Sequence, residues 1–189
     1  MLIFSVLLLL LSFNTARASD DVEKLIVKGY VHVCNPRAEM PEFIADSTVT
    51  AARKTGLPVG LLVAIQQVES NFNVFAVSPK SAYGLMQVHY PTWAPVLKSK
   101  IHFFVPYYNV LTGAEILKHY IEVEGGNVEK ALYRYLGLPN AKNYNQHVQR
   151  LRYVKAVLNN YKNYLKFRSM VINYQTAFKA EDIKEVEND

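Results

Sequence analysis

The sequence predicts a mainly α-helical single domain, and three observations support that fold class. Apolar residues recur at helical spacing in several segments, Gly or Pro follows most of these segments, and no repeat or low-complexity linker divides the 189 residues. A chain of this length can bury a core of its own as one domain. We expect the domain to occupy residues 41–165, between an N-terminal lead-in at 19–40 and a C-terminal extension at 166–189.

An apolar stretch at the start of the chain predicts export. Leu2 to Phe13 is too short to span a bilayer comfortably, and the small-residue pattern Ala16-Arg17-Ala18 follows it. We expect residues 1–18 to be a secretory signal peptide that is cleaved after Ala18. An uncleaved anchor is the alternative, because no Lys or Arg precedes the apolar stretch.

The lead-in cannot be assigned to one type of element. Ile26-Val27 and the segment from Tyr30 to Val33 are rich in β-branched residues and end at Asn35-Pro36. A brief strand and an irregular segment are both compatible with this pattern.

A helix is predicted from Pro41 onward, where apolar and small residues recur on one side and Gly56 marks the stop. The residues that define this side are Phe43, Ile44, Ser47, Thr48, Ala51 and Ala52. Leu57-Pro58 then restarts the chain as a second helix with proline in its first turn.

Turn-forming residues between Asn71 and Tyr83 indicate a loop after the second helix. Three further helices are predicted at 109–124, 128–136 and 144–167, and glycines follow the first two. The aromatic residues of segment 166–178 either extend the last helix onto the body or contact a partner. The charged residues 179–189 are predicted to be a solvated, flexible end.

Charge and cysteine content narrow the function classes. The formal net charge of +5 falls to +4 when Arg17 leaves with the signal peptide, which suits an anionic polymer and is too small to indicate nucleic acid. Cys34 is the only cysteine, so no intrachain disulfide can form. Its apolar neighbours suit a buried small hydrophobe, while an intermolecular bridge and a reactive thiol stay open.

Histidine spacing gives no indication of a metal site. The five histidines lack the close spacing that zinc ligands use, and we predict neither a metal nor a cofactor. They are His32, His89, His102, His119 and His147.

Glu69 is the candidate catalytic residue. It lies four residues after Ile65 and seven after Leu62, so its carboxyl group shares the apolar side of the second helix. Partial desolvation there raises the pKa of the carboxyl group and keeps the proton that a general acid donates. The alternative is an ordinary helix-terminal glutamate that reaches water or pairs with a lysine.

Two motifs support the catalytic interpretation. Glu69-Ser70, then a polar loop, then Gly84-Leu85-Met86-Gln87 resembles the catalytic core of the soluble lytic transglycosylase (SLT-domain) family. That family is related to goose-type lysozyme and cleaves bacterial peptidoglycan. The likeness covers residues 42–160 and includes Asn109-Val110 with Gly113, Ala131-Leu132 with Tyr135 and Gly137, and Tyr153-Val154 with Val157-Leu158.

The resemblance implies a lysozyme-like domain with a helical cleft and a role for each matched residue. Glu69 would be the sole general acid and base, while Ser70 and Gln87 would contact sugar or orient Glu69. Met86 would pack at the cleft wall, and Tyr135 would place its hydroxyl group near Glu69. Ordinary core packing is the alternative for Met86, and a buried tyrosine with a satisfied hydroxyl group is the alternative for Tyr135.

The same resemblance implies a peptidoglycan lytic transglycosylase, a lyase that leaves 1,6-anhydro-MurNAc. We expect a periplasmic or secreted monomer that binds glycan strands, with an envelope-spanning secretion or conjugation apparatus as a further partner. A goose-type hydrolase and a non-catalytic wall-binding or assembly protein are the competing functions.

A gap in the acidic residues favours the single-acid mechanism. No Asp or Glu occurs between residues 70 and 114, whereas two-carboxylate glycosidases place their second carboxylate about 5 to 10 Å away. The gap is compatible with a second carboxylate only if a distant one folds back into the cleft, and the candidates are Asp46, Glu115, Glu122 and Glu124.

Departures from the family pattern predict an altered far side of the cleft. Leu136 stands where asparagine is usual, Val105 where an acidic residue is common, and Gln149-Arg150 where Glu-Thr is usual. Aromatic side chains near the motif either stack on sugar rings or pack internally, and these are Tyr83, His89, Tyr90 and Trp93.

Overall fold

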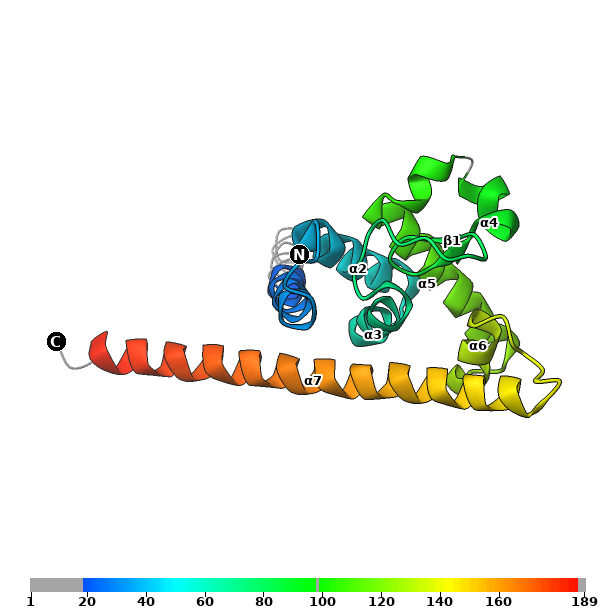
Figure 1. Cartoon of the computed structure of the whole chain (residues 1–189). Helices are drawn as coiled ribbons and strands as arrows, with labels where there is room; N and C mark the ends of the chain where they lie inside the picture. The colour runs from blue at the N-terminus through cyan, green and yellow to red at the C-terminus, as the bar shows by residue number, and fades with distance from the viewer. Residues whose placement is uncertain (1–18, 98, 187–189) are drawn as a thin grey trace, which may run out of the picture.

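The computed structural model describes residues 19–97 and 99–186 and confirms the mainly α prediction. Figure 1 shows a body of helices lying against one long helix, α7, which extends past the body toward the C-terminus. In chain order the elements are a helix at 19–34, α2 (Pro41–Thr55), α3 (Val59–Ser70), β1 (Ala82–Tyr83), β2 (Val88–His89), α4 (Tyr90–Leu97), the 3₁₀ helix η1 (Lys100–Phe103), α5 (Pro106–Val123), α6 (Val128–Tyr135) and α7 (Tyr144–Val186).

The helix α3 lies at the centre of the body. Its residues 61–66 are all buried, so this helix is covered on every side rather than on one face. The flank of α3 packs along α7, where Gly60 approaches the rings of Tyr161 and Tyr164. This close packing fixes the N-terminal end of α3, and Glu69 lies near the other end of the same helix.

Several predicted helices are confirmed with small shifts at their ends. The predicted side of α2 is buried except for Phe43, which is 65% exposed, and Gly56 ends the helix in the left-handed conformation with φ 75°. α5 begins at Pro106, three residues before the predicted start, and α6 begins after Asn127, whose side chain accepts a hydrogen bond from the backbone N–H of Lys130.

Residues 19–34 form a helix, so both alternatives predicted for the lead-in, a brief strand and an irregular segment, are wrong. Ile26, Val27, Tyr30 and Val31 are all buried, and their spacing places them on one helical face. Packing of this face against the body outweighs the β preference of the branched side chains.

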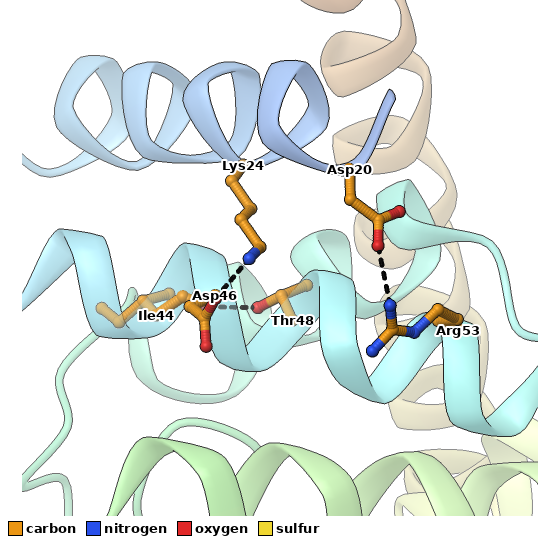
Figure 2. Close-up of polar contacts among 6 residues, drawn as sticks. All are labelled: Asp20, Lys24, Ile44, Asp46, Thr48 and Arg53. Atoms are coloured by element: carbon orange, nitrogen blue, oxygen red, sulfur yellow. Dashed lines mark hydrogen bonds and ion pairs between the residues drawn. The ribbon is translucent and has the colours of Figure 1, made fainter. Parts of the chain in front are cut away.

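Ion pairs along α2 flank this hydrophobic contact. Figure 2 shows Lys24 paired with Asp46 at 2.6 Å and Asp20 paired with Arg53 at 3.0 Å. In the same view the Thr48 hydroxyl group donates to the backbone carbonyl of Ile44 at 2.7 Å. Exposed pairs of this kind contribute about 0 to 1 kcal/mol each, so the buried apolar face supplies most of the attachment.

The segment 166–178 continues α7, which agrees with the predicted alternative that it extends the last helix onto the body. Phe167 packs edge-on against Tyr30 at 5.5 Å, and Tyr164 does so at 5.3 Å while its hydroxyl group donates to Glu23 at 2.6 Å. The lead-in helix and the extension therefore pack against each other. Beyond this contact Tyr174 is 68% exposed.

Cys34 is partly buried and packs against the core, in agreement with the small-hydrophobe interpretation. Burial raises the pKa of its thiol, while side-chain hydrogen bonds with Tyr30 and Gln67 oppose the shift. The thiol therefore has a smaller thiolate fraction than a free cysteine at neutral pH.

The hairpin and α4 are not predicted from sequence. β1 and β2 contribute two antiparallel residue pairs, Ala82 with His89 and Tyr83 with Val88. α4 follows directly and contains Pro95, a residue that argues against a helix interior.

Across residues 19–97 and 99–186, no helix has both the length and the hydropathy needed to cross a bilayer. The predicted signal peptide at 1–18 and residues 187–189 of the predicted flexible end lie outside the described residues.

Gly60→Ala tests the close approach of α3 and α7. A Cβ atom at Gly60 would come within 2.6 Å of the Tyr164 ring, and we expect the clash to lower the free energy of unfolding by about 1 to 3 kcal/mol despite alanine's better helix propensity. Denaturant unfolding measures this change.

Gly29→Ala is the matched control, because a Cβ there would meet Phe167 at an ordinary 3.4 Å. We expect it to be neutral or stabilising. Equal stability of the two variants would contradict the proposed packing constraint.

Candidate functional site

A cavity of about 550 Å³ lies where the C-terminal end of α3 meets the hairpin, α4, α5, α6 and the start of α7. Figure 1 shows these elements grouped on the side of the body that carries α6. The lining residues are Glu69, Ser78, Lys80, Ala82, Gln87, Val88, His89, Thr92, Trp93, Ile116, Tyr120, Arg134, Tyr135, Leu136, Gly137, Leu138 and Gln149.

Glu69 lies on the wall of this cavity, one residue before the end of α3. Ile65 and Leu62, which share its side of the helix, are fully buried. Burial raises the pKa of Glu69 to about 7, and a side-chain hydrogen bond from Tyr153 opposes part of that rise. Near neutral pH the carboxyl group is therefore divided between its protonated and ionised forms.

Tyr153 holds the Glu69 carboxyl group from the other side of the site. Its hydroxyl group donates to Oε1 of Glu69 at 2.5 Å, and the ring is buried in α7. Burial and the nearby Glu69 charge raise the pKa of Tyr153 well above its ordinary value, so the phenol stays a hydrogen-bond donor.

Tyr135 and Gln87 complete the polar part of the wall. The Tyr135 hydroxyl group donates to the backbone carbonyl of Met86 at 2.8 Å, and burial together with the Glu69 charge raises its pKa well above the ordinary value. Gln87 has φ 48°, and its Nε2 donates to the carbonyls of Gly84 and Ala76 at 3.1 and 3.3 Å. Both side chains are fixed before any ligand arrives.

Asn109, a buried residue of α5, clamps the turn that precedes Gln87. Its Nδ2 donates to the carbonyls of Tyr83 and Phe103, and its Oδ1 accepts from the N–H of Met86, all at 2.8 Å. Gly84 lies directly beneath, where a Cβ atom would come within 2.5 Å of Asn109 Nδ2. The turn formed by Gly84-Leu85-Met86-Gln87 is therefore held by hydrogen bonds to Asn109, and its first position has room only for glycine.

The family of the chain follows from a comparison with protein-family models. The model described as the transglycosylase SLT domain matches residues 47–156, which is more than half of the chain. The chain belongs to the transglycosylase SLT domain family. This match and the helical architecture agree with the predicted lysozyme-like fold, and the matched residues lie inside the predicted range 41–165.

Among solved structures, the chain is similar to that of an inactive Glu-to-Gln mutant of the lytic transglycosylase Slt from Pseudomonas aeruginosa. The sequence identity is 21% and the TM-score is 0.48. The likeness covers 69% of this chain and 24% of the Slt chain, so the chain matches about a quarter of that protein's length.

The structure brings Glu69, Gln87 and Tyr135 of this SLT domain to one cavity, but it places Ser70 and Met86 elsewhere. The Ser70 hydroxyl group contacts the backbone carbonyl of Leu85 at 2.8 Å, and Met86 is fully buried. Neither residue lines the cavity. The sugar contact predicted as one role of Ser70 stays a prediction, and Met86 is part of the buried core next to Gln87.

Of the four aromatic side chains near the motif, two lie at the cavity and two pack inside the protein. His89 and Trp93 line the cavity, whereas Tyr83 and Tyr90 pack in an aromatic cluster around Phe103 at 5.9 and 5.3 Å. This partly buried pair of tyrosines packs the hairpin and the start of α4 against η1.

Some of the residues that depart from the family pattern lie at the cavity, and one lies away from it. Leu136 and Gln149 line the cavity, while Val105 lies at the start of α5 and does not. The altered side of the cavity is therefore the side formed by the end of α6 and the beginning of α7.

The candidate second carboxylates lie outside the cavity in the described part of the chain. Asp46 pairs with Lys24 on the far face of α2, and Glu124 pairs with Arg134 at the cavity wall without lining it. Glu115 and Glu122 are not lining residues either, which leaves Glu69 as the one carboxylate there. Within residues 19–97 and 99–186, no three His, Cys, Asp or Glu residues are grouped so that they could hold a metal.

Another cavity, of about 530 Å³, lies between the lead-in helix, α2 and α7. Its charged residues neutralise one another, since Asp20 pairs with Arg53 at 3.0 Å and Glu23 pairs with Arg168 at 2.9 Å. These pairs join helices, so this cavity is part of the scaffold.

Tyr153 and Asn109 are the residues of the site that motif analysis leaves without a role. Both belong to motifs that resemble the SLT family: Asn109 lies near the start of α5, and Tyr153 lies within α7. A tyrosine and an asparagine inside otherwise apolar helical stripes are the signal, because a buried polar group needs a partner.

Glu69→Gln should alter the pH dependence of stability. The folded pKa of about 7 exceeds the unfolded value, so the contribution of Glu69 is fully present below about pH 4.5 and is lost as the pH rises through 7. Relative to the variant, wild type should lose roughly 2 to 3 kcal/mol of unfolding free energy between pH 4.5 and 8. Urea unfolding at both pH values measures this, and a pH-independent difference would exclude the raised pKa.

Tyr153→Phe should raise the pKa of Glu69 further, because the lost hydrogen bond favours the ionised carboxylate. Carbon-13 NMR of labelled glutamate follows the titration directly. Tyr161→Phe serves as the control on the same helix, and we expect no change there. An unchanged or lower pKa in the Tyr153 variant would argue against the contact.

Proposed function

We propose that the chain is a lytic transglycosylase that cleaves the MurNAc-GlcNAc bond of peptidoglycan and leaves a 1,6-anhydro-MurNAc end. The observation that carries the proposal is the Glu69 carboxyl group, which lies on a cavity wall with its pKa raised to about 7. Membership of the SLT domain family supports the choice of substrate.

The first half of the reaction needs a proton donor. Glu69 gives its proton to the oxygen that joins MurNAc C1 to the neighbouring sugar, and the bond between C1 and that oxygen breaks. Glu69 then carries the negative charge. The Tyr153 hydroxyl group, 2.5 Å from Oε1, stabilises that charge by a charge-assisted hydrogen bond.

The second half needs a nucleophile, and the substrate itself supplies it. The C6 hydroxyl oxygen of MurNAc attacks C1, and its proton passes to the Glu69 carboxylate. A new C1–O6 bond closes the 1,6-anhydro ring, no water is consumed, and Glu69 regains its proton. This sequence is supported by the absence of a second carboxylate among the lining residues, because a double-displacement or water-activating mechanism uses two.

The remaining wall supplies recognition. Gln87 and Tyr135 are fixed by hydrogen bonds to backbone carbonyls, so little ordering is required when sugar binds. The His89 and Trp93 side chains offer flat surfaces at the same cavity. Lys80 adds a cation that suits an anionic polymer.

Digestion of purified cell-wall sacculi tests the proposal. We expect the protein without residues 1–18 to release muropeptides whose MurNAc ends are one water lighter than hydrolysed ends, as mass spectrometry detects. Glu69→Gln should lower the rate by about 10²- to 10⁴-fold, with binding to sacculi retained, because the neutral isostere keeps the shape and removes the proton donor.

Gln67→Ala is the matched control, since Gln67 lies on α3 but outside the cavity. Hydrated MurNAc ends would instead establish a goose-type hydrolase. Sacculus binding without muropeptide release would establish a non-catalytic wall protein. Unchanged release by Glu69→Gln would remove Glu69 from the mechanism.

A further inference from the structure

A basic cavity adjoins the proposed cleft at the N-terminal end of α7. It measures about 500 Å³, and its lining residues include Lys142, His147 and Arg150 but no carboxylate. Figure 1 places the beginning of α7 beside α6, which also borders the cleft. A cavity with this lining favours an anionic ligand.

Arg150 is held in place within this cavity. Its guanidinium group stacks over the Tyr133 ring at 4.2 Å, and Nη1 donates to the carbonyl of Pro139 at 3.2 Å. Arg150 takes part in none of the ion pairs of the described residues, and its Nε is buried without a hydrogen-bond acceptor there. The guanidinium group is thus held in place without an ion-pair partner among the described residues, and a bound anion can supply one.

At two places in the chain, residues that line the basic cavity are close in sequence to residues that line the cleft. Gly137 and Leu138 line the cleft, and residues 140–143 line the basic cavity after Pro139. Gln149 lines the cleft, and Arg150, the next residue of α7, lines the basic cavity. The two cavities are therefore bordered by neighbouring residues at both places.

We propose that the basic cavity is a subsite for a carboxylate of the peptide that branches from the glycan strand. The proposal rests on the proposed function, because that function places a peptide-bearing glycan in the cleft. Each peptide carries ionised carboxylates, and the planar guanidinium group of Arg150 suits a carboxylate better than a neutral sugar. The start of α7 adds a favourable field for an anion.

Direct binding of a stem peptide separates this subsite from the cleavage reaction. We would use free peptide prepared from sacculi by an amidase and record amide shifts of the protein lacking residues 1–18 by NMR. Saturable shifts in residues 140–150, lost when the peptide carboxylates are amidated, are expected. Absence of saturable shifts there would overturn the subsite, whatever the outcome of the cleavage assay.

Kinetics on two substrates add a second measurement. Wild type should cleave peptide-bearing glycan strands with a kcat/KM about tenfold above that for amidase-stripped strands, the worth of one charge-assisted hydrogen bond. Lys142→Glu and Arg150→Lys should reduce this ratio toward one, mainly through KM. Lys142 is exposed, so its variant is not expected to disturb the fold.

Lys162→Glu is the matched control, since it changes the charge by the same amount on an exposed position of α7 outside both cavities. Its substrate ratio should equal that of wild type. A ratio near one for wild type, or an unchanged ratio in both test variants, would overturn the subsite while leaving cleavage itself in place. If the wild-type protein cleaves neither substrate, that result would instead count against the proposed function.

Discussion

The contact between Glu69 and Tyr153 is the interaction on which the site depends. It joins α3 to α7 through a short hydrogen bond in a place where burial opposes ionisation of the carboxyl group. Two influences of opposite sign therefore act on one proton, and desolvation is the larger. The result is a carboxyl group whose proton can leave and return near neutral pH, which is the property that acid and base chemistry at a single residue requires.

The rest of the wall is organised around backbone carbonyls rather than around other side chains. Asn109, Tyr135 and Gln87 each bind carbonyl groups of the segment from Ala76 to Met86. That segment has almost no regular structure of its own, so these bonds replace the ladder that a sheet would supply. The cavity shape is thus set by buried polar contacts that α5 and α6 bring to a loop.

Sequence alone predicts the parts of this molecule in which local pattern and tertiary packing agree. α2 and α5 show apolar spacing and a glycine at or near the end, and Glu69 can be placed on the inner side of α3 by counting from Ile65. The segment around Val27 misleads because its branched side chains favour a strand while their spacing suits a helix. The strands of the hairpin, at two residues each, are too short for alternation to be visible. Tyr153 shows the limit of such reasoning, since it lies 84 residues from Glu69, its hydrogen-bond partner, and no local pattern connects them.

The length of α7 determines which truncated fragments of the protein would keep the whole core. The segment of this chain that matches the SLT domain ends at residue 156, between Tyr153 and Tyr164, and it omits the helix at 19–34. A fragment with those limits would keep both partners of the central hydrogen bond but discard the aromatic layer of Tyr30, Tyr164 and Phe167. The packed core of the described residues therefore extends beyond the segment that matches the SLT domain, and a fragment limited to that segment would have an incomplete core.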